Sequence, residues 1–146
     1  MNQAIQDFVG SKNIAVVGVS RSGKKFGNSV AAELKQRGYQ VYIVHPEAQE
    51  IGGERCYPNL AALQGKAEAV VICVSPRQSP QALRDAAAAG IQRIWLQQGA
   101  DSPEIPALAK ELGVQPVTGK CILMYAPPVK SIHGFHRGIM KLVGQL

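Results

Sequence analysis

The amino-acid sequence predicts an α/β fold, a single three-layer domain with a mainly parallel five-stranded sheet. Two observations support this fold class: apolar runs alternate with amphipathic segments along the chain, and the connections between them are short. Strands that alternate with helices form βαβ units, and the crossovers of such units make neighbouring strands parallel. The 146 residues are enough to bury a substantial core, so we expect residues 1–146 to form one domain.

The N-terminal half contains a short helix, a strand, a second helix and a second strand. The run over 13–19 is apolar at consecutive positions, which indicates a strand buried on both faces. Val30 and Leu34 recur at helical spacing, and Gly38 is typical of the position after a helix end. Asn59 is suited to cap a short helix. The expected elements are a helix over 3–9, strands over 13–19 and 41–44, a helix from residue 26, an extended loop over 47–58 and a short helix over 60–63.

The second half repeats the alternation of strands and helices. Residues 69–74 are apolar throughout, which again indicates a strand covered on both faces. Gly90 and Gly113 each follow a helical pattern and mark its end. The expected elements are strands over 69–74, 91–97 and 114–117 and helices over 80–89 and 103–112.

The C-terminal segment has an amphipathic pattern of its own. Phe135, Ile139 and Leu142 fall on one helical stripe. We therefore expect a helical tail over 125–146 that packs on the domain. The same stripe is suited to contact a second copy of the chain or an enzyme partner.

Composition and charge restrict the classes of function. The formal net charge is +6, and lysines and arginines stand in pairs rather than in a long run, which favours a compact anionic small molecule over nucleic acid. No apolar run reaches the length of about 18 residues needed to span a membrane, and the N-terminus lacks the pattern of a secretory signal. The three widely spaced cysteines match neither a disulfide framework nor a zinc site, so we expect a cytoplasmic protein without a bound metal.

The residues after the first strand have the composition of a phosphate-binding loop. The apolar run ends in glycines, hydroxyls and cations, and a helix follows at once; the amides at the start of such a helix bind phosphate. Two nucleotide-binding motifs are nearly matched. Lys25 replaces the magnesium-binding hydroxyl of G-x-x-x-x-G-K-[ST], and Ser20 replaces the middle glycine of G-x-G-x-x-G. The candidate phosphate ligands are Gly18, Ser20, Arg21, Ser22, Gly23, Lys24 and Lys25.

These departures from the motifs discriminate between nucleotide ligands. Magnesium-dependent phosphoryl transfer is not expected, because the hydroxyl after Lys24 is missing and no apolar strand ends in Asp. NAD fits poorly, because the end of the second strand carries His45 and Pro46 instead of an acidic residue. NADP remains open, since its 2′-phosphate suits nearby cations. Coenzyme A carries a pyrophosphate and a separate 3′-phosphate, and it fits the same residues.

Other candidate ligand contacts follow the second, third and fourth strands. In open parallel sheets, ligands bind beyond the carboxyl ends of the strands, at the point where the strand order reverses. We therefore expect the residues after these strands to lie beside the phosphate loop. They are His45, Pro46, Val74, Ser75, Pro76, Gln97, Gln98 and Gly99.

Six segments stand in an order and spacing typical of one protein family. They are Ile14-Ala15-Val16-Val17-Gly18-Val19-Ser20, residues 38–46, residues 51–60, residues 69–75, Gly90-Ile91 with residues 94–97, and Gly119-Lys120-Cys121. Over about residues 12–121 the chain resembles the small CoA-binding proteins with a Rossmann-like domain, which are related to the N-terminal region of the succinyl-CoA synthetase alpha subunit. The resemblance implies that the loop from Ser20 to Lys24 holds the phosphates of coenzyme A, and that the ends of the next three strands line the adenosine and pantetheine.

Two positions depart from the common pattern of that family. His45 stands where Asn often precedes the proline, and Ser75-Pro76-Arg77 differs from many members. The resemblance also places a cysteine at Cys121 in many relatives. A thiol there, beside Lys120, is a candidate redox group that can form a mixed disulfide with coenzyme A.

We therefore predict a protein that binds coenzyme A or an acyl-CoA through the loop after the first strand. The prediction is of a binding or regulatory protein without catalysis of its own, and no catalytic residue is assigned. Two alternatives stay open on the same fold: an NADP-linked oxidoreductase, and a redox sensor that acts through Cys121.

Overall fold

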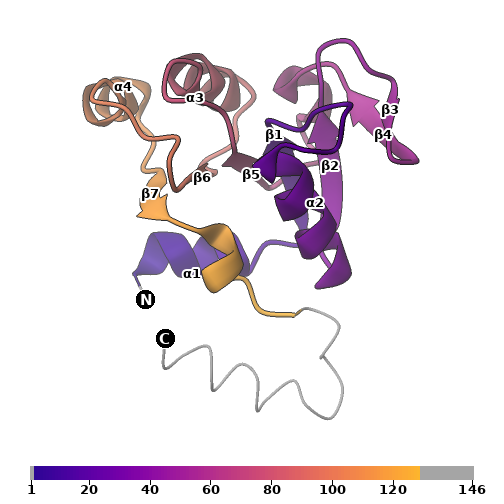
Figure 1. Cartoon of the computed structure of the whole chain (residues 1–146). Helices are drawn as coiled ribbons and strands as arrows, with labels where there is room; N and C mark the ends of the chain where they lie inside the picture. The colour runs from indigo at the N-terminus through magenta and orange to yellow at the C-terminus, as the bar shows by residue number, and fades with distance from the viewer. Residues whose placement is uncertain (1, 129–146) are drawn as a thin grey trace.

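Strands and helices alternate along residues 2–128, the part of the chain described by the computed structural model (Figure 1). The helices are α1 (Gln3–Val9), α2 (Phe26–Gln36), α3 (Ser79–Ala88) and α4 (Ile105–Leu112), and the short 3-10 helices are η1 (Leu60–Leu63) and η2 (Ile122–Met124). The strands are β1 (Asn13–Val17), β2 (Gln40–Val44), β3 (Glu50–Ile51), β4 (Glu54–Tyr57), β5 (Ala69–Ile72), β6 (Arg93–Gln97) and β7 (Val117–Lys120).

The strands form one sheet in the order β3-β4-β2-β1-β5-β6-β7. All neighbouring pairs are parallel except β3 and β4, which are antiparallel. At the carboxyl end of β1, Val17 lies opposite Val44 of β2 on one side and Ile72 of β5 on the other. The chain therefore leaves β1 at the place where the strand order reverses, which is where open parallel sheets bind ligands.

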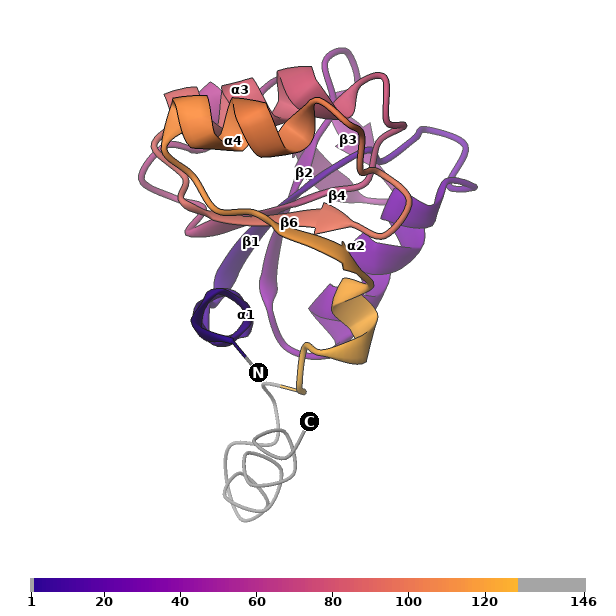
Figure 2. The same ribbon diagram turned by 90° about the vertical axis from the view of Figure 1, so that its left-hand side faces the viewer.

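Helices cover both faces of the sheet and make three layers (Figures 1 and 2). The face that carries α1, α2 and η2 has one buried core cluster, and the face that carries η1, α3 and α4 has another. Side chains alternate along β1, so Ile14 and Val16 enter the first cluster while Ala15 enters the second. All three are fully buried, as expected for a strand covered on both sides.

The sheet has seven strands, and the expectation of five was wrong. The two additional strands, β3 and β4, form a hairpin within the segment 47–58, which was expected to be an extended loop. Gly52 and Gly53 form the turn, and both have positive φ values (57° and 83°) that glycine adopts without strain. β4 pairs with β2 at two positions and with β3 at two positions. Such short pairings leave no periodic signal in the sequence.

The final strand lies three residues later than expected, at Val117–Lys120 instead of 114–117. Val114 lies in the turn that closes α4, because its amide donates a hydrogen bond to the carbonyl of Ala109. Pro116 has no N–H to donate to a neighbouring strand. Pairing with β6 therefore begins at Val117, opposite Trp95.

Several local predictions are confirmed. The first helix covers residues 3–9 as expected, and the Asn2 side chain accepts a hydrogen bond from the Ile5 amide. Asn59 caps η1 by accepting from the amide of Ala62. Gly38 has φ 101° directly after the last turn of α2, a conformation that ends the helix.

Within the described residues, no helix is long and apolar enough to cross a membrane, and no group of three or more metal-ligating side chains gathers. The predicted helical tail over 125–146 lies outside the described residues from position 129 on, so its packing and its contact with a partner stay predictions.

Candidate functional site

Two glycines let the candidate phosphate loop, residues 18–25, pass between β1 and α2. Gly18 has φ 106°, and a Cβ at this position would overlap the carbonyl of Cys73, which follows β5. A Cβ at Gly27, in the first turn of α2, would overlap the carbonyl of Gly18. The helix therefore starts in direct backbone contact with the end of the strand. Sequence reasoning identified Gly18 but missed Gly27, since the motif assigns the third glycine to position 23.

Asn28 fixes the conformation of the loop at Ser20. Its side-chain Oδ1 accepts hydrogen bonds from the Ser20 amide (3.0 Å) and hydroxyl (3.1 Å), and its Nδ2 donates to the Ser20 carbonyl (2.9 Å). All three polar groups of one loop residue are thus held by one side chain on α2. Sequence reasoning missed Asn28, because nothing in the local pattern distinguishes it from an exposed helix residue.

Further hydrogen bonds close the rest of the loop into a turn. The Gly23 amide donates to the Ser20 carbonyl (3.2 Å), and the Ser22 Oγ accepts from the Lys24 amide (3.3 Å). The hydroxyl oxygens of Ser20 and Ser22 are 3.0 Å apart. Gly23 has φ 76° and open space where a side chain would be. The predicted loop residues are therefore gathered in one preformed turn at the start of α2.

The start of α2 favours an anion. The N-cap residue is Lys25, whose side chain makes no capping hydrogen bond, so the first-turn amides lack the acceptor that an N-cap side chain can supply. Of these amides, that of Asn28 donates to the Lys25 carbonyl (3.0 Å). These amides and the helix dipole create a positive potential, which the exposed side chains of Arg21, Lys24 and Lys25 increase. Among the described residues, none of these three cations is in an ion pair. They are available to a phosphate group.

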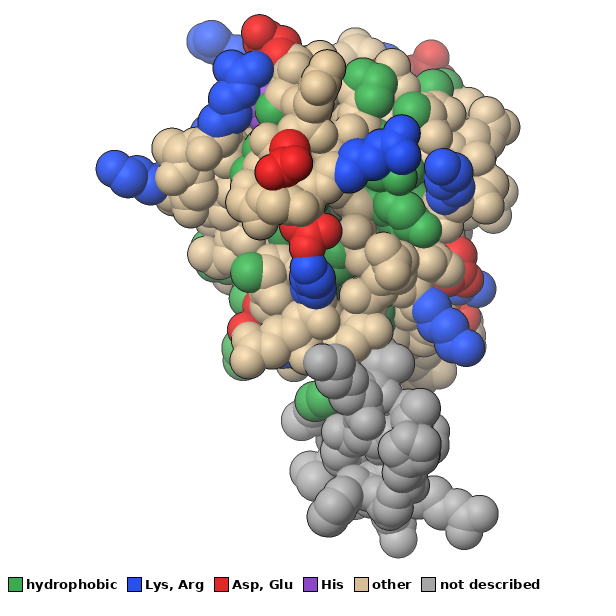
Figure 3. Space-filling view, turned by 90° about the vertical axis from the view of Figure 1, so that its right-hand side faces the viewer, with side chains coloured by type: hydrophobic (Ala, Val, Ile, Leu, Met, Phe, Trp, Pro, Cys, Tyr) green, Lys and Arg blue, Asp and Glu red, His purple; other side chains and the backbone are tan. Residues whose placement is uncertain are grey.

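Charge elsewhere does not form one large basic surface on the face shown in Figure 3. There, Lys and Arg side chains are scattered, with acidic and apolar side chains among them (Figure 3). Binding of duplex nucleic acid typically uses a clustered basic face. This face is better suited to a small anion than to a long duplex.

The ends of β2, β5 and β6 place the other predicted contacts at the same edge of the sheet. Some of these side chains already hold hydrogen bonds within the protein, and others are exposed. His45 Nδ1 accepts hydrogen bonds from the amides of Glu47 (3.1 Å) and Ala48 (2.9 Å). Gln97 is buried, and its Oε1 accepts from the Ile122 amide (3.0 Å). Both side chains therefore have a structural role. Pro46, Ser75, Pro76 and Gln98 are more exposed, Val74 is half-buried, and Gly99 has φ 94°.

The hydrogen bonds of His45 show why histidine suits this position, where the family pattern expected from the sequence has asparagine. An Asn side chain before such a turn accepts from amides two and three residues further along. His45 Nδ1 accepts from the same two amides. The ring thus supplies the acceptor that the turn requires.

The cysteines differ in burial. Burial raises the pKa of Cys73 to about 12, with a smaller contribution from the neighbouring Cys121. Cys73 is consequently a poor nucleophile at neutral pH. Cys121 is half-buried directly after β7, and its assignment as a redox thiol stays a prediction.

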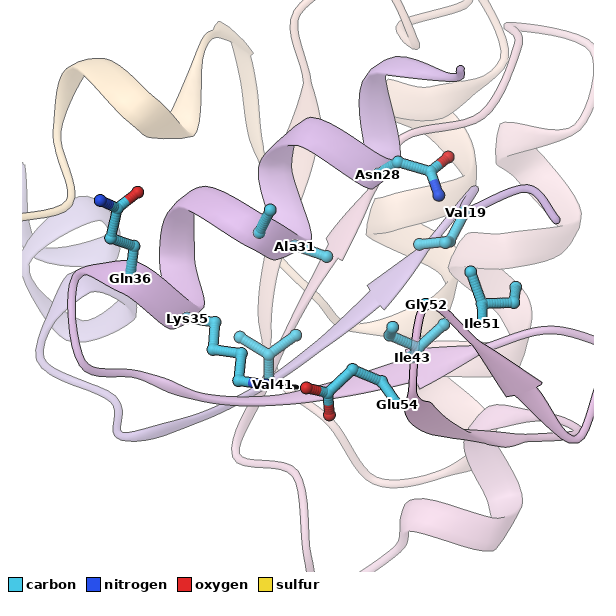
Figure 4. Close-up of a pocket in the computed structure, with 11 residues that line it drawn as sticks. Val19, Asn28, Ala31, Lys35, Gln36, Val41, Ile43, Ile51, Gly52 and Glu54 are labelled. Carbon is cyan, nitrogen blue, oxygen red and sulfur yellow. Dashed lines mark ion pairs between the residues drawn. The ribbon is translucent and has the colours of Figure 1, made fainter. Parts of the chain in front are cut away.

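A groove of about 510 Å³ lies beside the candidate phosphate loop, between α2 and the β3–β4 hairpin (Figure 4). Val19 and Asn28 lie at one end of it, and the ion pair between Lys35 and Glu54 crosses it further along α2. None of the site residues expected from the sequence lines this groove. The other residues that line it are Ala31, Ala32, Gln36, Val41, Ile43, Ile51 and Gly52.

The comparisons with known proteins identify the family of the chain. A family model described as a CoA binding domain matches residues 12–127, so the chain belongs to this family of CoA-binding domains. The loop, the sheet and the groove all lie within the matched residues. Membership supports coenzyme A as the ligand and gives no support to the NADP alternative.

Relatives include both larger enzymes and small proteins. The chain is 30% identical over 90 residues to an ADP-forming acetate–CoA ligase of Archaeoglobus fulgidus. The matched segment covers 60% of this chain and 13% of the ligase. A structure of a conserved hypothetical protein from Pyrococcus furiosus is 34% identical, with a TM-score of 0.72 and coverage of 77% of this chain and 97% of that one. A structure of a dinucleotide-forming acetyl-coenzyme A synthetase from Ca. Korarchaeum cryptofilum is 26% identical, with a TM-score of 0.66. The match covers 80% of this chain and 27% of the synthetase chain. The chain therefore spans less than a third of the enzymes it matches.

Proposed function

We propose that this protein binds coenzyme A, with the phosphates on the loop from Ser20 to Lys25 and on the first-turn amides of α2. The observation that carries this proposal is the loop itself. Asn28 holds Ser20 by three hydrogen bonds, and the helix behind it has no side-chain cap. A loop ordered in advance loses little conformational entropy when an anion binds. Family membership supplies the identity of the ligand.

The proposed role is binding or regulation without catalysis. The segment shared with the acetate–CoA ligase is 13% of that enzyme, so the match concerns a domain of the family rather than a complete ligase. The polar side chains with defined partners at the sheet edge, such as His45 and Gln97, are used to hold turns and strands together. A carrier or sensor of coenzyme A needs only the binding site.

Titration calorimetry tests this function directly. We expect coenzyme A to bind more tightly than dephospho-CoA, because the loop cations interact with the 3′-phosphate, and we expect NADP to bind more weakly than either. Lys24→Ala should weaken the binding of coenzyme A by about 1–3 kcal/mol. The matched control is Lys110→Ala on α4, an exposed lysine on the opposite face of the sheet. Binding of NADP alone would overturn the proposal, and equal affinity in wild type and Lys24→Ala would remove Lys24 from the site.

A further inference from the structure

Two cysteines, Cys73 and Cys121, follow the strands that flank β6. Cys73 comes directly after β5, and Cys121 comes directly after β7. Within the sheet, β5 and β7 are two strand spacings apart, about 10 Å. A disulfide joins Cα atoms that are about 4.4–6.8 Å apart, so cysteines facing each other within these two strands would be too distant. The path of the chain after β7 therefore decides whether the two thiols meet.

The chain leaves β7 and turns over β6, because side chains of β6 bind the peptide groups on both sides of Cys121. Trp95 Nε1 donates to the Lys120 carbonyl (2.9 Å). Gln97 Oε1 accepts from the Ile122 amide (3.0 Å). From there η2 contacts α2, so the segment crosses the face of the sheet toward that helix (Figure 1). Cys121 is thus held on the face that carries α1, α2 and η2.

Cys73 lies on the same face, beside the residue that anchors this turn. Its side chain packs against the core cluster of that face. The last paired residues of β5 and β6 are Ile72 and Leu96, so Cys73 is next to Gln97. Burial and, to a smaller extent, the neighbouring Cys121 raise the pKa of Cys73, and the second contribution agrees with two sulfurs close to each other.

We propose that Cys73 and Cys121 are a redox pair, which closes to an intramolecular disulfide when the protein reacts with a small-molecule disulfide, R–S–S–R. The Cys121 thiolate attacks one sulfur of R–S–S–R, which forms a mixed disulfide and releases RS⁻. The Cys73 thiolate then attacks the Cys121 sulfur and releases the second RS⁻. The protein pair loses two electrons and its two thiol protons, and R–S–S–R gains the two electrons. This inference goes beyond the proposed function and does not depend on coenzyme A.

The two cysteines have different roles in this sequence of steps. Cys121 reacts first, since it is half-buried and its side chain makes no hydrogen bond to cap η2. Cys73 stays protonated at neutral pH, because burial raises its pKa to about 12, so closure of the pair is the slow step. A Cβ at Gly18 would overlap the Cys73 carbonyl, so the new bond forms directly beside the candidate phosphate loop.

Oxidation with glutathione disulfide at mildly alkaline pH, followed by mass spectrometry under non-reducing conditions, tests the pair. We expect intact wild type to lose two hydrogen atoms and to retain no glutathione, and its peptide map to link Cys73 to Cys121. Cys73→Ala should stop at the mixed disulfide, with one glutathione on Cys121. The matched control is Cys56→Ala, because Cys56 is buried on β4, three strand spacings from β5, and this variant should form the same bond as wild type.

The peptide map of wild type decides the outcome even where a variant does not fold. Wild type that stays reduced, that keeps glutathione on Cys121, or that forms disulfides only between copies of the chain would overturn the proposal. A bond that includes Cys56 would overturn it as well. Thermal unfolding of the reduced variants verifies that each of them retains the fold before it is oxidised.

Discussion

At the scale of single residues, the candidate site depends on groups that have no side chain or a short one. Gly18 and Gly27 bring β1 and α2 into backbone contact, and Asn28 then fixes Ser20. Gly18 could be recognised from the sequence because it ends an apolar run. Gly27 and Asn28 could not, since their roles arise from contacts with positions 18 and 20 that exist only after the helix packs on the strand.

The two loop glycines should differ in their tolerance of a side chain. Gly18→Ala introduces a Cβ that overlaps the Cys73 carbonyl and also requires φ 106°, so we expect it to lower the free energy of unfolding by about 3 kcal/mol or more. Gly23→Ala has the same kind of positive φ but open space around the Cβ, and should cost only about 1–2 kcal/mol. Urea denaturation measures both. Equal losses of the free energy of unfolding in the two variants would contradict the overlap of a Gly18 Cβ with the Cys73 carbonyl.

At the scale of elements, the sequence predicted the central strands and the four α-helices of residues 2–128 but not the hairpin. Apolar runs such as Val16-Val17 and Val70-Val71 identify buried strands directly, and Gly38 and Gly113 identify helix ends. The hairpin β3–β4 has only two paired positions within itself and two with β2, so it leaves no periodic signal. The groove that the hairpin forms with α2 was therefore beyond what the sequence could indicate.

The start of β1 is tied to the segment before β5 by one carboxylate. Glu68 Oε1 accepts hydrogen bonds at 3.0 Å from the Lys12 amide, the Asn13 amide and the Asn13 side chain. The Lys12 hydrogen bond makes the largest contribution to lowering the pKa of Glu68 below its ordinary value of 4.5. A lowered pKa in the folded state means that the ionised group stabilises the fold above about pH 4.5, and that this stabilisation is lost as pH falls through the folded-state pKa.

Glu68→Gln should therefore destabilise the protein at pH 7 and have a smaller effect as the pH is lowered from 5 to 3. Urea denaturation at several pH values measures this, with Glu111→Gln on the exposed side of α4 as the control. A difference between wild type and Glu68→Gln that stays constant from pH 7 to pH 3 would contradict this role of the carboxylate.

At the scale of the whole molecule, the strand order places the loop after β1 between two diverging halves of the sheet. The β2 half supplies the groove, and the β5 and β6 half supplies Ser75 and Gln98 at the same edge. A long ligand with phosphates near its middle fits this geometry, because each of its two ends has one half of the sheet to lie on. Coenzyme A is such a ligand, and the family match covers every one of these elements.

The most direct test follows the backbone amide signals of the ¹⁵N-labelled protein by NMR during titration with coenzyme A. We expect the largest shifts at residues 20–28, because the proposed phosphate site is the loop after β1 and the start of α2. Small or absent shifts at residues 20–28, with the largest changes on α3 and α4, would contradict the assignment of the phosphate site to this loop.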